Sequence, residues 1–266
     1  MALENIGALV YLPDEKKIER YTADSMESFD EIDAYWMQRE GLLFYPFDRS
    51  KQAYFFSNDP NENTITEFDL SPNEPLTQLE YETSVYLARV DMETGDLEKV
   101  VLARNEIIQG QFDPEESFQK AVKKYPNSYG YYVNIGPEVW VGASPELLLH
   151  YADGVVYTVA LAGTKSLSEE FTHKEHEEQK MVAQFIEEKL AKIGLINFTK
   201  SEVQEATFGD IKHLKTAYTA QADKLQALEL LKHLQPTSAV CGLPRDKSFG
   251  FIQEFETMNR SFYSGI

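Results

Sequence analysis

Short apolar runs between polar turns predict strands along much of the chain. Runs rich in branched and aromatic residues are typical of strands, and they occur early at 8–13, 41–47, 52–57 and 84–90. Later runs are joined by short connections, and consecutive strands with such links are antiparallel. These later strands are expected at 99–104, 129–135, 138–144, 146–151, 154–162, 200–207 and 211–221.

Helical patterns appear between and after these runs. Asp113 followed by Pro114 marks the start of a helix that is expected to continue to 125. Two further helices are expected at 223–234 and 247–263. The longest helix is predicted at 169–193, where an apolar stripe is formed by Met181, Val182, Phe185, Ile186, Leu190 and Ile193. Runs of strands with helices gathered between them indicate an α+β fold with large antiparallel sheets.

No repeat, low-complexity tract or linker interrupts the chain, so a single domain is predicted over 1–266. With 266 residues, 42% of them hydrophobic, the chain is long enough to bury a sizeable core. Residues 1–85 contain no recognisable motif and are expected to form scaffold. The candidate chemistry therefore lies in 86–266.

The chain is strongly acidic, with 44 acidic and 25 basic residues and a formal net charge of -19. Such a charge repels nucleic acids and anionic membranes, and no apolar run approaches the roughly 18 residues that span a bilayer. The single cysteine, Cys241, excludes an internal disulfide and suits a reducing compartment. A cytoplasmic protein without nucleic-acid or membrane partners is expected. To handle a small anion it needs a metal ion or a few well-placed cations.

The segment 99–104, with the sequence KVVLAR, begins an apolar run with a lysine. Adjacent apolar residues without alternation predict a strand buried on both faces. An ammonium at the edge of such a layer is costly unless it is paired or loses its proton. Lys99 is therefore a candidate base. The alternative is that Lys99 ends the strand and reaches water along its aliphatic stem.

Two glutamates lie on the same side of the long helix as its apolar stripe. Glu178 precedes Val182 by four residues, and Glu175 lies three residues earlier. Inward carboxylates must be paired, protonated or bound to a cation, and Mg²⁺ prefers oxygen ligands. The alternative is that both remain hydrated beyond the core. Four charged residues of the helix lie off the stripe and are expected to be solvated: Glu177, Lys180, Glu187 and Glu188.

Other blocks carry weaker signals of chemistry. Glu146 follows a turn and opens an apolar strand, where poor solvation would raise its pKa. Gly163 and Thr164 stand where a strand ends and a backbone can approach a ligand. His213 lies in a strand-like run, and a loop rich in Pro and Gly covers 234–244.

Taken in order from about residue 81 to the end, these blocks resemble the chorismate-utilising enzymes. That family comprises isochorismate, salicylate, anthranilate and aminodeoxychorismate synthases. The resemblance implies two large stacked antiparallel sheets with helices outside, chorismate as substrate, and Mg²⁺ as cofactor. The blocks that carry it are KVVLAR, GASPELLL, ALAGT, KEHEEQKMV, HLKT, PTSAVCGLP and RSFYSG.

The resemblance also implies roles for individual residues. Lys99 would be the general base that activates water for attack at C2 of chorismate, and Glu146 the general acid that protonates the departing C4 hydroxyl. Glu178 would be a Mg²⁺ ligand, and Glu175 would act on the metal through water. The implied substrate-binding residues are Gly163, Thr164, His213, Ala239 and Tyr263.

Three positions distinguish branches of the family. The branches that use ammonia resemble one another in having Gln where this chain has Lys99. One aminodeoxychorismate type has a lysine nucleophile in the place of Ala162, and the branches that expel pyruvate usually have Thr in the place of Ala239. All three favour isochorismate synthase, acting in menaquinone or siderophore biosynthesis. Salicylate synthase is the alternative, because it also uses the water-activating lysine.

Members of this family continue beyond the position of Ile266. The further segment normally supplies an arginine, a glycine-rich turn, a second metal glutamate and a lysine. We therefore expect missing C-terminal strands and little or no activity from the chain as given. A non-catalytic fragment, or a subunit completed by another chain, is the alternative to an active enzyme. A monomer is expected, with association through exposed sheet edges as the other possibility.

Overall fold

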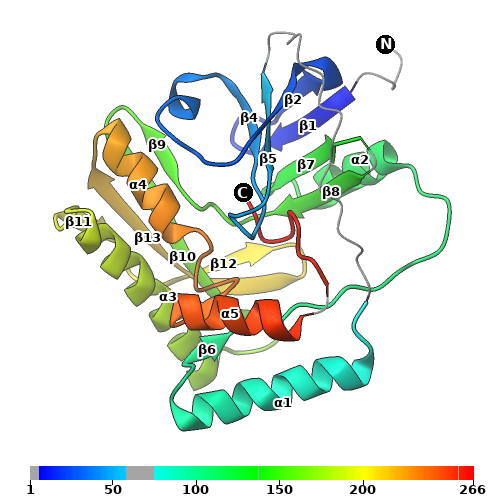
Figure 1. Ribbon diagram of the computed structural model, residues 1–266. Coiled ribbons are helices and arrows are strands. Elements are labelled where there is room, and N and C mark those ends of the chain that lie inside the picture. Colours follow the sequence, from blue (N-terminus) through cyan, green and yellow to red (C-terminus); the bar gives the residue numbers. More distant parts are fainter. Residues whose placement is uncertain (1–5, 58–74, 137, 257) are drawn as a thin grey trace.

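The computed structural model describes residues 6–57, 75–136, 138–256 and 258–266 (Figure 1). A four-stranded antiparallel sheet has the order β2-β1-β7-β8. Its strands are β1 (Ile6–Leu12), β2 (Lys17–Thr22), β7 (Tyr129–Asn134) and β8 (Val139–Ser144). The pairing of β1 with β7 joins the first residues of the chain to its middle.

A second antiparallel sheet has the order β11-β13-β10-β9, and β12 also pairs with β13. Smaller sheets have the orders β3-β5-β4 and β14-β6. The predicted α+β class with large antiparallel sheets is confirmed. These sheets are built from β3 (Met26–Phe29), β4 (Gly41–Phe44), β5 (Ala53–Ser57), β6 (Lys99–Val100), β9 (His150–Ala152), β10 (Val155–Ser166), β11 (Phe198–Lys200), β12 (Gln204–Phe208), β13 (Ile211–Gln221) and β14 (Gly242–Leu243).

Helices α3 and α4 lie along the outer side of the second sheet in Figure 1, α5 and α1 lie below it, and α2 packs against β7 and β8 of the first sheet. Helices α3 and α4 share a buried apolar cluster with β10 and β13, whose largest members include Phe185, Ile186, Leu190 and Tyr218. The apolar stripe of the long helix therefore forms the main core, as predicted. The helices are α1 (Gln78–Thr94), α2 (Pro114–Lys124), α3 (His173–Lys192), α4 (Lys224–Leu234) and α5 (Arg245–Phe255).

The predicted strand at 84–90 is wrong, because this segment belongs to helix α1. The side chain of Thr77 accepts from the Glu80 amide, and Glu80 in return accepts from the Thr77 amide. Gly95 ends the helix in the left-handed conformation, with φ of 84°. This capping box and terminal glycine are helix signals that override the strand preference of the branched and aromatic residues between them.

Three other predicted boundaries also change. Helix α5 ends at Phe255, because Glu256 adopts extended backbone, so the helix predicted at 247–263 is too long. The strand predicted at 200–207 is divided into β11 and β12. The strand predicted at 146–151 is reduced to β9, which starts only at His150.

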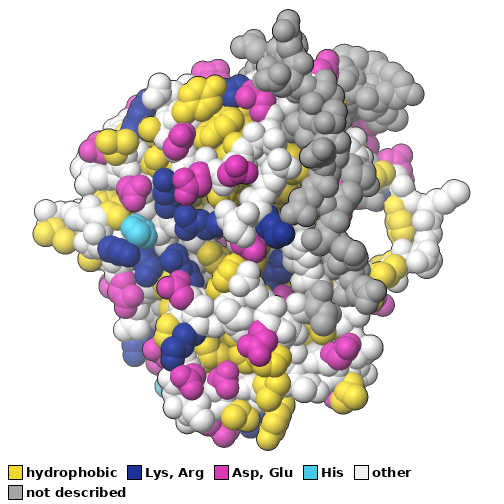
Figure 2. All heavy atoms as spheres, viewed as in Figure 1, with side chains coloured by type: hydrophobic (Ala, Val, Ile, Leu, Met, Phe, Trp, Pro, Cys, Tyr) yellow, Lys and Arg dark blue, Asp and Glu magenta, His cyan; other side chains and the backbone are white. Residues whose placement is uncertain are grey.

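Basic side chains gather at helix ends of this acidic protein. Figure 2 shows Lys and Arg side chains together in the region of α3, α4 and α5, with acidic side chains around them. His233, in the last turn of α4, interacts electrostatically with Lys189 and Lys192 of α3 and with Arg245. Cations compensate the partial negative charge at helix C-termini. This gathering is therefore explained by the helices themselves.

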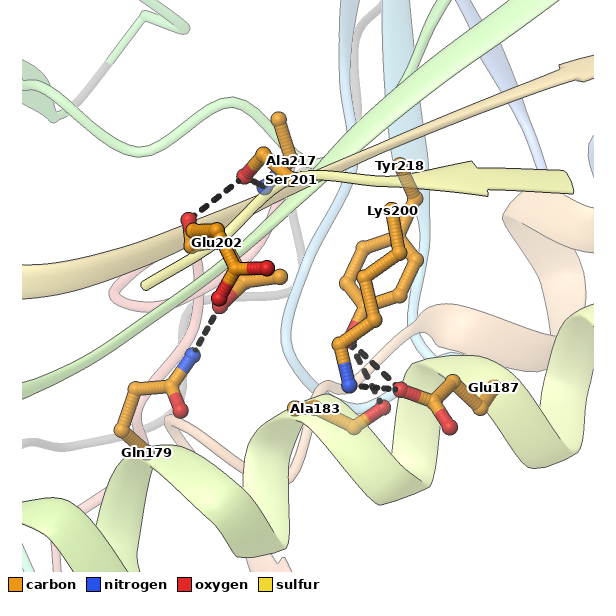
Figure 3. A network of polar contacts seen from close by, with 9 residues as sticks. Gln179, Ala183, Glu187, Lys200, Ser201, Glu202, Ala217 and Tyr218 are labelled. Atoms are coloured by element: carbon orange, nitrogen blue, oxygen red, sulfur yellow. Dashed lines mark hydrogen bonds and ion pairs between the residues drawn. The ribbon is translucent and has the colours of Figure 1, made fainter. Parts of the chain in front are cut away.

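A polar network joins α3 to the second sheet (Figure 3). Gln179 Nε2 donates to Thr216 Oγ1 at 2.6 Å, in the interior. About two turns further along the helix, Glu187 Oε1 accepts from the Tyr218 hydroxyl at 2.9 Å and from Lys200 Nζ at 2.7 Å. Glu187 lies off the apolar stripe and is 33% exposed, as predicted for a surface residue, but it is paired with residues of β11 and β13 and not only with water.

Replacing Glu187 is expected to destabilise the fold. Glu187→Ala leaves the buried Tyr218 hydroxyl and the Lys200 ammonium without this acceptor, which costs about 1–3 kcal/mol. Urea unfolding followed by circular dichroism measures the loss. Glu188→Ala, at an exposed position of the same helix, is the matched control and should change the unfolding free energy little. Equal effects of the two substitutions would contradict the importance of the network.

Candidate active site

Lys99 lies on the short β6–β14 ladder, where it pairs with Leu243 and Val100 pairs with Gly242. Its Nζ donates to the backbone carbonyl of Ser238 at 2.9 Å. The predicted strand at 99–104 is much shorter than expected, since regular pairing stops after Val100. Beyond that point the Val101 amide still donates to the Cys241 carbonyl, and side chains from the end of the chain bind the Val101 carbonyl and the Ala103 amide.

The surroundings of Lys99 favour loss of its proton. Lys99 is half-buried, and burial lowers the pKa of its ammonium below the ordinary 10.5. Glu178 and then Glu146 act in the opposite direction, because their negative charges favour the ammonium. The fold thus brings the predicted acid and the predicted metal ligand each into electrostatic range of the predicted base.

Glu146 follows β8 in a segment without regular structure. Its backbone amide donates to Ser144 Oγ at 3.2 Å, which fixes the turn that carries it. Burial raises the pKa of the Glu146 carboxyl, and the nearby Lys99 only partly opposes this. A carboxyl in such a place is suited to hold and donate a proton.

A chamber of about 490 Å³ opens beside Glu146. It lies between β4, β7, β8, the 235–240 loop and the last residues of the chain. Tyr263, 53% exposed, also lines it, as does Thr237 in the block that contains Ala239. The remaining walls are largely apolar and include Leu42, Phe44, Tyr131, Val240 and Phe262.

Residues of the expected scaffold also line this chamber, which the sequence did not predict. Val10 lies on β1 and Leu42 to Phe44 lie on β4, so both come from the first 85 residues. They reach the chamber only because β1 pairs with β7 and because Tyr45 exchanges backbone hydrogen bonds with Ile266. No local motif marks these positions.

Two hydroxyls near Lys99 were also missed. Within the described part of the chain, Thr237 Oγ1 and Ser238 Oγ are buried and have no hydrogen-bond partner. Ser238 is fully buried, and its own carbonyl is the acceptor for Lys99. Buried polar groups are normally satisfied. These hydroxyls are therefore candidates to contact water or a ligand beside Lys99.

The predicted residues Gly163, Thr164 and His213 meet at the end of the β10–β13 ladder. A bulge interrupts the ladder between Ala162 and Thr164, and Gly163 has a positive φ of 72°. Thr164 Oγ1 lies 3.0 Å from His213 Nδ1, and burial lowers the pKa of His213. These described residues do not line the chamber beside Glu146, and Ala239 packs against the core cluster of α3 and α4, so Tyr263 is the predicted substrate-binding residue that lines the chamber as described.

Gly163 is required for the close approach of α3 to β10. A Cβ atom at this position would lie 2.8 Å from the Glu175 carbonyl oxygen and 2.9 Å from the Glu175 Cβ. Both atoms belong to the first turn of α3, which cannot move without opening the core. The glycine therefore has a packing reason that is independent of any ligand.

Gly163→Ala is expected to lower the unfolding free energy. The positive φ alone costs about 1–3 kcal/mol for a residue with a side chain, and the contact with Glu175 adds to it. Gly250→Ala, in helix α5 with no atom near the added Cβ, is the control. It should be neutral or stabilising by up to about 1 kcal/mol. Thermal unfolding of both variants tests this contrast.

Glu175 is buried at the start of α3, and both of its carboxylate oxygens have partners. Its Oε2 accepts from the Thr172 amide at 2.8 Å and from the Thr172 hydroxyl at 2.7 Å. Lys165 Nζ lies 3.5 Å from Oε1. The alternative that Glu175 stays hydrated beyond the core is therefore wrong. The two Thr172 hydrogen bonds lower the pKa of Glu175 to about 2.

Glu175 should make stability depend on pH in acid. Because its folded pKa is about 2 and the ordinary value is 4.5, its stabilisation is present above pH 4.5 and is lost as pH falls towards 2. Glu175→Gln can still accept a capping hydrogen bond but cannot titrate. Its unfolding free energy should fall less steeply than that of the unaltered chain between pH 4.5 and 2.

The matched control is Glu188→Gln on the exposed side of the same helix. It should keep the steep acid dependence of the unaltered chain. Urea unfolding at a series of pH values measures all three proteins. If the unfolding free energies of Glu175→Gln and of the unaltered chain fell in parallel between pH 4.5 and 2, Glu175 would not be the source of the acid dependence.

Glu178 fits as one ligand of a Mg²⁺ ion. In the described ranges, no group of three or more His, Cys, Asp or Glu side chains could enclose a metal. Mg²⁺ is however commonly held by one or two carboxylates together with water and oxygen atoms of the ligand. Glu178 is half-buried and close enough to favour the charged form of Lys99. It can therefore serve such an ion, whereas Glu175 is already engaged.

The family follows from comparison with known proteins. A family model described as "Chorismate binding enzyme" matches residues 47–266. The chain belongs to this family of chorismate-binding enzymes. The predicted resemblance is thus confirmed and extends well upstream of residue 81. Among the residues that the structure describes, no helix has the length and apolar character needed to cross a membrane.

Relatives of this chorismate-binding chain include more than one branch. It is 26% identical over 206 residues to anthranilate synthase component 1 of Pseudomonas aeruginosa, covering 71% of this chain and 42% of that protein. It is 28% identical over 194 residues to isochorismate synthase MenF of Haemophilus influenzae, covering 67% and 45%. The chain thus spans about half the length of the curated relatives it matches.

The fold is also found in a solved structure of the family. DhbC of Bacillus anthracis, assigned as a 2,3-dihydroxybenzoate-specific isochorismate synthase, superposes with a TM-score of 0.80 at 20% sequence identity. The match covers 99% of this chain and 81% of DhbC. At this identity the likeness concerns the fold alone, and the reaction must be argued from the residues.

Proposed function

We propose that the chain carries the active-site residues of an isochorismate synthase, which isomerises chorismate to isochorismate. The observation that carries this proposal is the opposite perturbation of two nearby groups. Burial lowers the pKa of Lys99 and raises the pKa of Glu146. Two groups whose pKa values are each shifted away from the ordinary value in this way are suited to act as base and acid in one reaction.

The perturbations matter because the required protonation states are rare for unperturbed groups. The reaction needs a neutral Lys99 and a protonated Glu146 at the same time. With ordinary values of 10.5 and 4.5, almost no molecules are in this state at neutral pH. For every unit by which the two pKa values approach each other, that fraction rises about tenfold.

The proposed steps balance in atoms and protons. Neutral Lys99 removes a proton from water as the water oxygen forms a bond to C2. Both ring double bonds shift, from C1=C2 to C1=C6 and from C5=C6 to C4=C5, and the bond between C4 and its hydroxyl oxygen breaks. Protonated Glu146 gives its proton to the departing hydroxyl, which leaves as water. One water is consumed and one is released, and a proton must return from Lys99 to Glu146.

Other residues would bind the substrate and the cofactor. We assign Glu178 as a Mg²⁺ ligand, and the ion would offset the charge of the ring carboxylate when bound. Gly163, Thr164, His213, Ala239 and Tyr263 are assigned to substrate binding. The apolar walls of the chamber beside Glu146 would exclude water from one side of the ring.

The choice of branch rests on Lys99, Ala162 and Ala239. A lysine base is needed for water and not for ammonia, which favours isochorismate synthase over the anthranilate branch represented among the relatives. Branches that expel pyruvate usually have Thr in the place of Ala239, so Ala239 favours a reaction in which pyruvate is not expelled. We further propose a cytoplasmic place in menaquinone or siderophore biosynthesis, which agrees with the net charge of -19 and the buried, unpaired thiol of Cys241.

The direct test is to incubate the purified chain with chorismate and Mg²⁺ and to separate the products by chromatography. Isochorismate is the product expected of whatever turnover the chain supports, and Lys99→Ala should reduce its formation by at least about a hundredfold. Lys120→Ala, at an exposed position of α2, is the matched control and should have no effect. Glu146→Gln should impair turnover as strongly as Lys99→Ala.

The other products identify the other candidates. Salicylate with pyruvate would favour the salicylate synthase alternative and would contradict the reading of Ala239. Anthranilate formed from ammonia would contradict the role of Lys99. A folded chain that neither binds nor converts chorismate would favour the non-catalytic alternative.

A further inference from the structure

A buried ion pair follows helix α5 and is not used by the proposed mechanism. The side chains of Glu256 and Arg260 are 2% and 3% exposed. Arg260 Nε donates to Glu256 Oε2 at 2.7 Å, and a second guanidinium nitrogen donates to Glu256 Oε1. The guanidinium also lies over the ring of Phe47, 4.5 Å from its centre. The contact is therefore bidentate and almost fully shielded from water.

The pair connects the two segments that surround Lys99. Arg260 donates to the Val101 carbonyl at 2.7 Å and to the Val240 carbonyl at 2.9 Å. Glu256 Oε1 accepts from the Ala103 amide at 2.7 Å. These are the backbone groups that regular strand pairing fails to satisfy beyond Val100. The ion pair thus continues the β6–β14 ladder with side chains.

Stability alone does not explain a charged pair at this place. Removing two charges from water is expensive, and apolar residues of similar volume commonly stabilise a core as well or better. A guanidinium, however, offers donors in a rigid planar arrangement. Arg260 can therefore hold two carbonyls from different segments at a fixed separation, which an apolar pair or a lysine cannot do.

The held segments are those that set the position of the Lys99 side chain. The ammonium donates to Ser238, two residues before Val240. The Lys99 carbonyl accepts from Ser248 Oγ at 2.9 Å, and the Val101 amide donates to the Cys241 carbonyl at 3.0 Å. Movement of either segment would break the contact between Lys99 and Ser238.

We propose that Glu256 and Arg260 are positioning residues that lock the Lys99 segment against the 237–241 loop and so hold the Lys99 ammonium on the Ser238 carbonyl. The importance of this for catalysis rests on the proposed role of Lys99 as base. The positioning itself can be tested without turnover.

The test measures the chemical reactivity of Lys99 across pH. The chain is treated with a limiting amine-acylating reagent between pH 6 and about 11, and acylation of each lysine is quantified by mass spectrometry. Lys120, whose side chain is 72% exposed, is the internal reference. Arg260→Lys keeps the charge but loses the planar donors. Glu256→Gln keeps an acceptor for Ala103 but loses the charge.

In Arg260→Lys, Lys99 should gain access to water, so the midpoint of its acylation profile should rise towards the ordinary value of 10.5. The maximal acylation rate of Lys99 should rise at least about threefold relative to Lys120. Glu256→Gln should produce a smaller shift in the same direction. Hydrogen exchange of the Val101 and Ala103 amides should become faster in both variants.

Arg39→Lys is the matched control, because Arg39 forms a bidentate pair with Glu27 in a distant sheet. It should lower stability without changing the Lys99 profile. An unchanged Lys99 profile in a folded Glu256→Gln or Arg260→Lys variant would overturn the proposal. An equal shift of the Lys99 profile in Arg39→Lys would also overturn it.

If the chain forms isochorismate, Arg260→Lys should lower kcat more than it raises KM. Loss of turnover with an unchanged Lys99 acylation profile would contradict the positioning role of Arg260 but not the proposed function of the chain.

Discussion

The long antiparallel pairing of β10 with β13 is the constraint on which much of the structure depends. It runs from Val155 opposite Gln221 to Ser166 opposite Ile211. Helix α3 packs across this pair, and its position is fixed by apolar burial at Phe185 and by polar contacts at Gln179 and Glu187. Because Glu178 lies on the same helix, the ladder also sets the position from which that carboxylate acts electrostatically on Lys99.

The candidate site combines groups that would each be unfavourable in isolation. A half-buried ammonium, a carboxyl with a raised pKa and unpartnered hydroxyls lie close together beside an apolar chamber. Such groupings are typical of functional sites, where electrostatic requirements outweigh the best packing.

Residues from the N-terminal part of the chain contribute to the walls of the chamber beside Glu146. Strand β1 belongs to the sheet that carries β7 and β8, and β4 supplies apolar walls of the chamber. The family match begins at residue 47, so some of these walls lie outside it. Substitutions at Val10 or at Leu42 to Phe44 can therefore alter the chamber without changing any of the residues proposed for catalysis.

The amino-acid pattern by itself determined the α+β class, the stripe on α3 and the strand at 211–221, because these depend on local periodicity. It also identified the family through the order of its blocks. Local signals were misread at α1, where the capping box of Thr77 and Glu80 outweighs the strand preference of the residues between. The capping box of Thr172 and Glu175 at the start of α3 is a local signal of the same kind. Only tertiary structure decided the partners of Glu187 and Lys99. Those partners are backbone and side-chain groups far away in sequence, and no local pattern encodes which of them will satisfy a buried polar atom.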